Sequence, residues 1–382
     1  MSKINSKDLS IGLYIHVPFC QSTCDFCAFY QKVPESGEIS AYLSLLEKEW
    51  DLRKIEEPVE TIFFGGGTPG LLAAKDWEKI GDLIRRKVGS SFKEWSVEMA
   101  PSLVTKTKVK TLKEIGVTRI SLGVQSFSDQ LLKKLGRQHS RQQILSAISI
   151  IQNSSFENWN LDLMFALPNQ SWLDLKKDLM EAVALKPTHL STYCLTIEDD
   201  TPLYWKFTRG EIKIDLNEET KLYTKTWDLL SSSGYIQYEI SNFGTTGFAC
   251  QHNLNTWKMN DWIGLGPAAA SQYKMRRWNN QACFKSWAKH ISRGYFPEEN
   301  IQVMSLQTLL EDTFIFGLRM NQGVDLSELA NKFGSFAVEK FQPILEKWQL
   351  DGYLIKKSNQ IYLNKSGRLL ADRIGASFLI DS

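Results

Sequence analysis

One stretch of the chain reads Tyr14-Ile-His-Val-Pro-Phe-Cys20-Gln-Ser-Thr-Cys24-Asp-Phe-Cys27 and carries three cysteines separated by three and two residues. Thiolates are the usual protein ligands of iron–sulfur clusters, and at this spacing a loop can wrap around three corners of a [4Fe–4S] cubane. The alternatives are a zinc site, with His16 as fourth ligand, and a fortuitous crowding of cysteines. His16 lies inside an apolar, strand-like run that fixes the direction of its side chain, which weakens the zinc alternative. The spacing therefore favours a cluster with one iron left open to a small molecule.

The bulk composition is that of an ordinary globular protein. Of 382 residues, 43% are hydrophobic and 23% are charged, and the formal net charge is +2. The near-neutral balance argues against a broad basic surface for nucleic acid. Residues 1–10 are polar and lack an apolar signal region, and no run of about 18 apolar residues is present to cross a bilayer. We therefore expect a cytoplasmic protein with no transmembrane segment, a compartment in which crowded cysteines indicate metal ligands before disulfides.

Short apolar runs alternate with longer amphipathic segments over the first two thirds of the chain. The expected strands cover residues 13–17, 61–64, 96–100, 119–124, 161–165 and 189–195. The expected helices cover residues 39–53, 74–88, 106–115, 141–152, 172–185 and 218–232. This alternation predicts an α/β fold with a parallel sheet. A partial (β/α)6 barrel, an open relative of the eight-stranded TIM barrel, and a doubly wound open sheet fit the pattern almost equally well.

The character of the sequence changes after about residue 300. Helices are expected at 309–320, 326–333 and 337–350, followed by a hairpin of 353–357 and 360–363. This pattern predicts a small winged-helix-like α+β domain over 301–382. A polar segment over 1–10, a barrel core over 11–245 and a connecting segment over 246–300 would precede it. Because the net charge is nearly neutral, a protein-contact or lid role suits this domain at least as well as DNA binding.

Glycine and polar motifs lie on or just after the expected strands. In barrels the active-site residues lie at the C-terminal ends of the strands. In Phe63-Phe-Gly-Gly66-Gly67-Thr68-Pro the glycines allow a ligand to approach the backbone, although a triplet alone is also typical of a tight turn. Glu98 and Asp162 lie inside apolar strands, where a carboxylate is costly unless it is paired, so a structural ion pair is the alternative to a ligand contact. Two further candidates are Gln125, which ends a strand, and Arg137, whose guanidinium suits a carboxylate.

Two aromatic residues lie in the cysteine motif itself. Tyr14 and Phe26 are candidates to shield a cluster from water or to stack on a flat ring, and plain packing explains each of them about as well. The remaining cysteines, Cys194, Cys250 and Cys283, are scattered, and we expect them to be small buried hydrophobes without a role.

The C-x3-C-x2-C motif resembles the signature of the radical S-adenosylmethionine (SAM) superfamily. Its surroundings resemble one group within it, which contains oxygen-independent coproporphyrinogen III dehydrogenases (HemN-type) and haem chaperones (HemW-type). The likeness covers residues 11–275 and, more weakly, extends to about 370. It implies a [4Fe–4S] cluster on Cys20, Cys24 and Cys27 whose free iron chelates SAM, which is then cleaved to a 5′-deoxyadenosyl radical. It also implies that SAM is contacted by Gly66, Gly67, Thr68, Glu98, Gln125, Arg137 and Asp162.

Two positions distinguish the branches of this group. The dehydrogenases resemble C-x3-C-x2-C-x-C, and Phe29 stands where their fourth cysteine would be. The chaperones carry H-N-x-x-Y-W, a motif linked to haem binding, which is matched here by His252, Asn253 and Trp257 with Thr256 in place of Tyr. Imidazole is a common axial ligand of haem iron, and Trp257 can pack on a porphyrin, although a capped loop with a buried Trp is the alternative. The likeness thus implies a haem chaperone, with a porphyrinogen-decarboxylating enzyme as the alternative.

The chain also departs from its group at several positions. Ala100 stands where Asn is usual, Ala166 and Asn169 replace glycines, and Ala268 and Ala270 replace the Gly and His of G-P-G-A-H-S. The cysteine and glycine motifs are intact, so we expect cluster and SAM binding to be retained. The expected partners are SAM, haem or a porphyrinogen, a haem-acceptor protein and an electron donor, the last two of unspecified identity.

Overall fold

A 12-stranded sheet organises the chain from β1 to β12, with the strand order β12-β11-β10-β9-β1-β2-β3-β4-β5-β6-β8-β7. The computed structural model describes residues 10–213 and 215–380, so nearly all of the polar segment predicted over 1–10 lies outside the described residues. The central strands are parallel neighbours in chain order: Ile11–Val17 (β1), Val59–Gly66 (β2), Glu94–Met99 (β3), Arg119–Gln125 (β4), Asn158–Phe165 (β5) and His189–Cys194 (β6). All six predicted strands are therefore confirmed.

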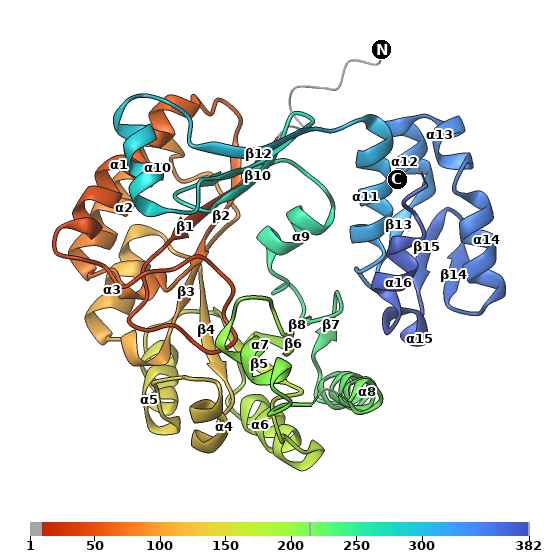
Figure 1. Ribbon diagram of the computed structural model, residues 1–382, viewed down its shortest axis with the longest axis horizontal. Helices are drawn as coiled ribbons and strands as arrows, with labels where there is room; N and C mark the ends of the chain where they lie inside the picture. The colour runs from red at the N-terminus through yellow and green to blue at the C-terminus, as the bar shows by residue number, and fades with distance from the viewer. Residues whose placement is uncertain (1–9, 214, 381–382) are drawn as a thin grey trace.

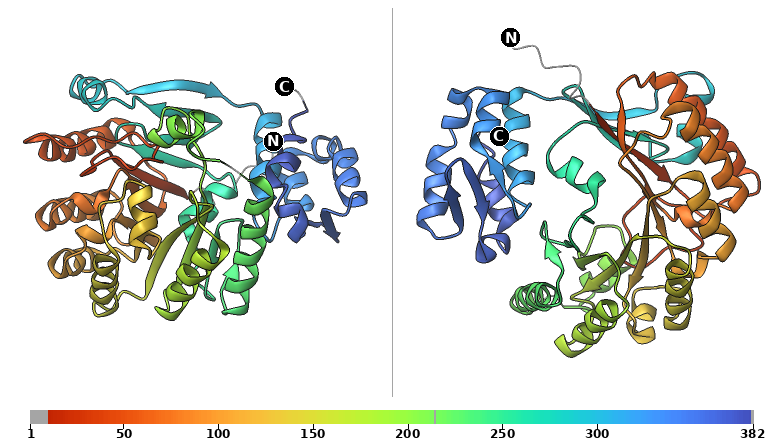
Figure 2. Two further views of the ribbon diagram at one scale, coloured as in Figure 1. Left: turned by 60° about the horizontal axis from the view of Figure 1, so that its bottom comes forward. Right: turned by 180° about the vertical axis from the view of Figure 1, so that it is seen from behind.

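The helices between these strands lie on the convex face of the curved sheet (Figures 1 and 2). They are Glu38–Arg53 (α1), Ala74–Lys87 (α2), Lys106–Ile115 (α3), Asp129–Lys134 (α4), Arg141–Gln152 (α5) and Trp172–Ala184 (α6). Pro202–Thr208 (α7) and Leu216–Ser232 (α8) follow β6 in the chain. Two short 3-10 turns, Pro69–Leu71 (η1) and Pro101–Leu103 (η2), follow β2 and β3. A doubly wound sheet would reverse its strand order and place helices on both faces. The observed order and the one-sided helical layer instead confirm the partial barrel.

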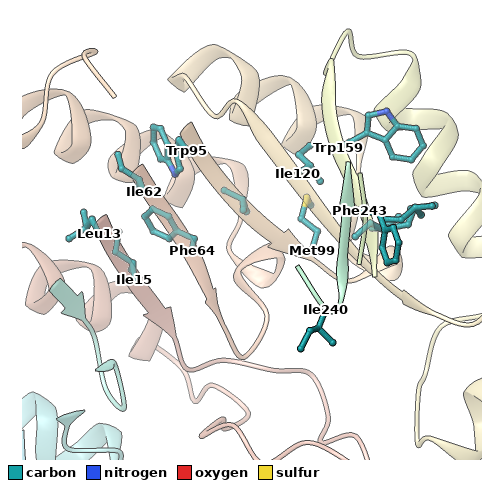
Figure 3. Close-up of a cluster of buried hydrophobic side chains, with 14 of the residues drawn as sticks. Leu13, Ile15, Ile62, Phe64, Trp95, Met99, Ile120, Trp159, Ile240 and Phe243 are labelled. Atoms are coloured by element: carbon teal, nitrogen blue, oxygen red, sulfur yellow. The ribbon is translucent and has the colours of Figure 1, made fainter. Parts of the chain in front are cut away.

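The apolar core lies between the sheet and this helical layer. Because side chains alternate along a strand, one set of strand residues points outward and is buried under the helices. Leu13, Ile62, Phe64, Trp95 and Ile120 belong to this set, and none is more than 1% exposed (Figure 3). The alternate residues point to the concave side of the sheet, so the polar residues of the same strands share an interior.

Residues 246–300, expected to connect two domains, instead extend the sheet. Trp262–Leu265 (β9) pairs in parallel with β1, and Ala270–Tyr273 (β10), Arg276–Asn280 (β11) and Glu298–Val303 (β12) continue from it in antiparallel fashion. Phe284–Ser292 (α10) packs on α1. At the other edge, Asn242–Gly244 (β8) and Ile236–Gln237 (β7) follow β6. Gln251–Trp257 (α9) contacts β1 and β2 on one side and the first helix of the C-terminal domain on the other (Figure 1).

The C-terminal domain has the predicted helices followed by a hairpin. Its elements are Leu306–Gly317 (α11), Val324–Asp325 (β13), Leu326–Phe333 (α12), Ser335–Glu339 (α13), Gln342–Leu350 (α14), Leu354–Lys357 (β14), Gln360–Leu363 (β15), Lys365–Arg368 (α15) and Ala371–Ala376 (α16). An antiparallel sheet of order β13-β15-β14 gives it a winged-helix-like arrangement. The single helix predicted over 337–350 is wrong: it divides into α13 and α14. Pro343, which cannot donate a backbone hydrogen bond, lies in the first turn of α14, where that loss costs nothing. None of the helices in the described part of the chain is both long and apolar enough to cross a membrane.

Candidate functional site

The three motif cysteines lie on the loop that joins β1 to α1. This loop is closed at its base, because the backbone N–H of Cys20 donates to the carbonyl of Lys32 at 2.9 Å and that of Lys32 donates to Pro18 at 2.7 Å. The N–H of Cys27 donates to the carbonyl of Cys24 at 3.2 Å. All three thiols are free and partly exposed. The loop therefore presents its thiols at the C-terminal end of β1, as the sequence predicts.

The glycine loop after β2 holds the cysteine loop in place. The backbone N–H groups of Gly67 and Thr68 donate to the carbonyls of Val17 and Phe19, both at 2.8 Å. A Cβ at Gly67 would lie 2.8 Å from each of these two oxygens, so only glycine fits. The Thr68 hydroxyl lies 3.2 Å from the Cys20 sulfur. These two amides thus donate to the protein's own cysteine loop, whereas the sequence suggested that the glycines allow a ligand to approach the backbone.

Tyr14 and His16 brace the cysteine loop from the interior. The Tyr14 hydroxyl lies 3.1 Å from Nδ1 of His16, and Nε2 of His16 lies 2.9 Å from the carbonyl oxygen of Tyr30. Both ring nitrogens of His16 are therefore engaged, so it is not available as a fourth zinc ligand. Gly66, at φ 102°, passes so close to this ring that a Cβ would lie 2.6 Å from it. Tyr14 does not line the cavity described next.

A cavity of about 440 Å³ opens beside the three thiols. Besides Cys20, Cys24 and Cys27, the predicted site residues that line it are Phe26, Gly66, Gly67, Thr68, Glu98, Gln125, Arg137 and Asp162. They come from the C-terminal ends of β2 to β5 and from the loops that follow β1 to β5, as expected for a barrel. The fold therefore brings these predicted residues together, apart from Tyr14, His252 and Trp257. We refer to this space as the cysteine cavity.

Two partly buried carboxyl groups, Glu98 and Asp162, line the cysteine cavity. Burial, reinforced by the nearby Asp162, raises the pKa of Glu98 to about 8. Burial also raises the pKa of Asp162, although that carboxyl accepts hydrogen bonds from Asn160 at 2.7 Å and from Ser121 at 3.2 Å. The Arg137 guanidinium lies 5.6 Å from the Phe26 ring, and its buried Nε has no hydrogen-bond partner among the described residues. The cavity thus offers carboxyl groups to a cationic ligand and the Arg137 guanidinium to a carboxylate, and Arg119 also lines it.

Several residues at the rim of the barrel adopt left-handed backbone conformations. Gln125 ends β4 at φ 68°, beside an irregularity in its pairing with β5. Ala166, Asn169 and Ala268 have φ of 58°, 62° and 62°, at positions where the sequence carries a residue other than the group's usual glycine. A residue with a Cβ pays about 1–2 kcal/mol for this conformation. These three residues therefore keep the left-handed backbone conformation, and each of them adds local strain.

Comparison with known proteins places this architecture in a family. Residues 14–182 match the model of the radical SAM superfamily, and residues 304–370 match that of the HemN C-terminal domain. The chain is 33% identical to the curated heme chaperone HemW of Bacillus subtilis over 372 residues, covering 96% of this chain and 98% of the relative. It is 30% identical to HemW of Lactococcus lactis over 373 residues, covering 96% and 97%. The chain belongs to the radical SAM superfamily, in its HemN and HemW group.

A solved structure supports the fold assignment. The coproporphyrinogen III oxidase HemN of Escherichia coli, described as a radical SAM enzyme, aligns with a TM-score of 0.83 over 97% of this chain and 90% of its own. Its sequence identity is 22%, so the likeness concerns the fold. The resemblance expected from the cysteine motif is thus confirmed at the level of the family. Membership of this superfamily implies a [4Fe–4S] cluster and SAM.

The residues present fit such a cluster. The three thiols line one cavity, and burial, with a smaller contribution from the neighbouring cysteines, raises the pKa of Cys20 and Cys27. Iron would stabilise the thiolate forms that burial disfavours. Among residues 10–213 and 215–380, no three His, Cys, Asp or Glu side chains converge closely enough to hold a metal ion. Each ligand of a cubane binds a different iron, so the three sulfurs need not converge on one point.

The predicted haem motif lies on α9, and of its matched residues only Asn253 lines the cysteine cavity. His252 is 6% exposed, its Nδ1 lies 2.9 Å from the Thr61 hydroxyl, and its ring stacks on Phe63 with centroids 5.2 Å apart. Trp257, at the other end of the helix, packs against Phe316 of α11. Five residues correspond to about 140° around a helix, so the two side chains leave different faces. Neither one lines the cysteine cavity.

Sequence reasoning missed the residue that anchors α9. Glu94, on the concave side of β3, accepts hydrogen bonds from the backbone N–H groups of Gln251 and His252 at 3.1 and 3.2 Å and from the Cys250 thiol at 3.3 Å. Cys250, to which no role was assigned, thus belongs to a buried polar contact and also lines the cysteine cavity, as does Asn253. The signal was available in the period-two alternation of Glu94, Ser96 and Glu98, but the predicted strand began at residue 96.

Proposed function

We propose that this chain is a haem chaperone that carries a [4Fe–4S] cluster on Cys20, Cys24 and Cys27, binds SAM in the cysteine cavity, and passes haem to an acceptor protein. The observation that carries the proposal is the likeness to curated heme chaperones of the HemW type over nearly the full length of both chains. Phe29, at the position of the fourth cysteine expected for a dehydrogenase, supports the same branch. Its side chain is 70% exposed and lines the mouth of the cavity.

The side chains of the cysteine cavity suit the charges of SAM. Its sulfonium and ammonium groups are cationic, and Glu98 and Asp162 are partly buried carboxyls that gain a partner when a cation approaches. Arg137, whose Nε has no partner in the described residues, is the corresponding group for the SAM carboxylate. A bound cluster would supply one electron at the iron that the three cysteines leave open. The protein contributes the closed cysteine loop, the charge pattern and the walls that exclude water.

For haem, the proposal assigns the iron ligand to His252. Its Nδ1 is engaged by Thr61, which leaves Nε2 as the nitrogen without a hydrogen-bond partner in the described structure. Burial lowers the pKa of His252 to about 4, so the ring is neutral and able to bind a metal at neutral pH. Because His252 is buried against Phe63, haem must displace part of this packing. The assignment therefore predicts that α9 shifts when haem binds.

The test is a haem titration of anaerobically reconstituted protein. We expect a shifted Soret band on binding, loss of that shift in His252→Ala, and no change in His290→Ala, which alters a histidine on α10 outside both cavities. Haem-loaded protein should then transfer haem to an apo-acceptor such as apomyoglobin. A wild-type protein with a complete cluster and no Soret shift would overturn the haem assignment.

A second candidate function is oxidative decarboxylation of coproporphyrinogen III. The match of residues 304–370 to the HemN C-terminal domain favours it, because that domain is named after the decarboxylating branch. Anaerobic incubation of the loaded protein with coproporphyrinogen III, SAM and a reductant should then yield protoporphyrinogen. Absence of product at full cluster occupancy would exclude this activity without affecting the chaperone proposal.

A further inference from the structure

A second cavity, of about 580 Å³, lies between the barrel and the C-terminal domain. Its barrel side is formed by the end of β6, by α7 and by α8, and its other side by α15, α16 and the turn after α11. It shares no lining residue with the cysteine cavity. Its volume lies within the range of about 300–1,000 Å³ that small-molecule sites occupy. We refer to it as the interdomain cavity.

Two guanidinium groups of the C-terminal domain line the interdomain cavity. The Arg368 guanidinium lies 5.2 Å from the Trp227 ring, its Nε is buried without a partner, and it forms no ion pair with any described residue. Arg319 also has a buried Nε without a partner, and its one ion pair is with Asp372, whose side chain is 90% exposed. An unpaired charge is costly to bury, and a guanidinium binds carboxylates in a fixed, two-pronged geometry. The arrangement is therefore incomplete without an anion.

The barrel contributes an aromatic wall to the same cavity. Tyr204, Phe207, Tyr223 and Trp227 line it, and Phe207 remains 38% exposed. Leu216, which also lines it, is 72% exposed. Exposed apolar side chains that gather around a cavity commonly mark a binding surface, and aromatic rings favour flat partners.

Acidic side chains balance these cations only in part. Glu219 lines the cavity, but burial, together with Asp215, raises its pKa and so favours its neutral form. Asp372 faces solvent and can exchange Arg319 for a ligand carboxylate at small cost, because exposed ion pairs contribute about 0–1 kcal/mol. The positive character of the cavity therefore comes from Arg368 and Arg319.

We propose that the interdomain cavity binds a flat aromatic ligand with two carboxylates, held by Arg319 and Arg368 and stacked on the aromatic wall of α7 and α8. A tetrapyrrole with two propionates belongs to this class, and that choice of ligand rests on the proposed function. Arg319 also lies 5.3 Å from the Trp257 ring, so the cavity adjoins the C-terminal end of α9. Such a ligand would bridge the two domains, with its carboxylates on Arg319 and Arg368 of the C-terminal domain and its ring on the aromatic wall of the barrel.

The test compares haem, metal-free protoporphyrin IX and the dimethyl ester of protoporphyrin IX, which lacks both carboxylates. We expect Arg368→Gln to weaken binding of the two diacids about tenfold, as loss of a charge-assisted contact does. Binding of the ester should be unchanged by the substitution. Arg368→Lys should retain part of the diacid affinity, and Arg373→Gln, which removes an exposed arginine of the same domain, should have no effect. Melting temperatures monitored by circular dichroism establish that each variant is folded.

The outcomes separate this inference from the proposed function. Haem binding that is unaffected by Arg368→Gln but lost in His252→Ala overturns the interdomain site and leaves the chaperone proposal standing. Haem binding that depends on Arg368 but not on His252 supports the interdomain site and overturns the assignment of the haem ligand. If Arg368→Gln weakens the ester as much as the diacids, carboxylate recognition is wrong. A wild-type protein that binds none of the three porphyrins overturns both ideas.

Discussion

The two cavities of this protein differ in their ionisable groups and in their construction. The cysteine cavity is built from successive strand ends of one barrel and contains two partly buried carboxyl groups, Glu98 and Asp162, whose pKa values are raised by their surroundings. The interdomain cavity is built from two domains and contains two partly buried arginines, each with a buried Nε that has no partner among the described residues, next to aromatic rings. The first suits a cation and the second a flat anion, so a single chain keeps two ligand chemistries apart.

Helix α9 is the physical link between the two cavities. Next to its first turn, Cys250 and Asn253 line the cysteine cavity. At its end, Trp257 contacts Arg319, which lines the interdomain cavity. Glu94 fixes its N-terminus to the barrel. A change at either cavity can therefore affect the other through the contacts of this one helix.

The largest effect is expected at the cysteine loop. Cys24→Ala removes one of three cluster ligands, so reconstituted protein should lose its iron and its brown absorbance almost completely, while its circular dichroism stays that of a folded barrel. Cys283→Ala is the matched control, because Cys283 is an exposed free cysteine outside both cavities. Iron bound to Cys24→Ala in the wild-type amount would show that the ligand assignment is wrong.

The next largest effect is expected at the anchor of α9. Glu94→Ala leaves the backbone N–H groups of Gln251 and His252 and the thiol of Cys250 without their acceptor. Each buried donor that loses its partner costs about 1–3 kcal/mol, so we expect the free energy of unfolding to fall by about 3 kcal/mol in a urea titration. Glu94→Gln retains one acceptor oxygen and should lose less.

A local measurement distinguishes this anchor from general destabilisation. Hydrogen exchange of the α9 amides should accelerate in Glu94→Ala, whereas the amides of β1 and β2 should keep their ranking as the most protected. Glu78→Ala, at an exposed position of α2, is the control. If protection falls equally throughout the barrel, Glu94 supports the sheet and does not specifically link the two cavities.

The sequence predicted the cysteine cavity much better than the interdomain one, and the reason is physical. The strands and motifs of the cysteine cavity repeat in chain order, so local periodicity and the rule of strand C-terminal ends placed the cysteine and glycine motifs at one rim, and the family resemblance implied that Glu98 and Asp162 join them. The interdomain cavity joins residues near 200, 320 and 370, whose proximity depends on how the two domains pack. Periodicity carries no information about such a contact.

The edges of the sheet were missed for a related reason. Strands β9 to β12 have four to six residues each, and β9 pairs with β1 across about two thirds of the chain. Their registry is fixed by the strand they join and not by their own pattern. The contact between Glu94 and Cys250 likewise spans 156 positions, so the anchor of α9 could not be derived from either segment alone.

A smaller effect is expected from the ionisation of Glu98 in the cysteine cavity. In the free protein the pKa of Glu98 is about 8, and a cationic ligand favours its carboxylate, so the bound form holds fewer protons than the free form. Affinity for SAM should therefore rise with pH as Glu98 ionises. Ionisation of Glu98 should by itself raise the association constant for SAM about fivefold between pH 7 and pH 8.

Equilibrium dialysis of SAM with reconstituted protein at these two pH values measures this contribution. Glu98→Gln stays neutral throughout, so dividing the wild-type ratio by the ratio for this variant removes the titration of SAM itself. We expect the quotient to be about five. A quotient of one would mean that Glu98 does not meet the cationic part of the ligand.

The smallest effect concerns backbone strain, which also differs between the cavities. Gln125, Ala166 and Ala268 have positive φ where strands end at the barrel rim, whereas no residue lining the interdomain cavity does. Ala268→Gly and Ala166→Gly should each raise the free energy of unfolding by about 1 kcal/mol, because the loss of strain exceeds the entropy that glycine adds to the unfolded chain. Ala288→Gly, inside helix α10, should lower it by about the same amount. If all three variants are destabilised alike, the left-handed residues at the rim carry no backbone strain, and the two cavities do not differ in this respect.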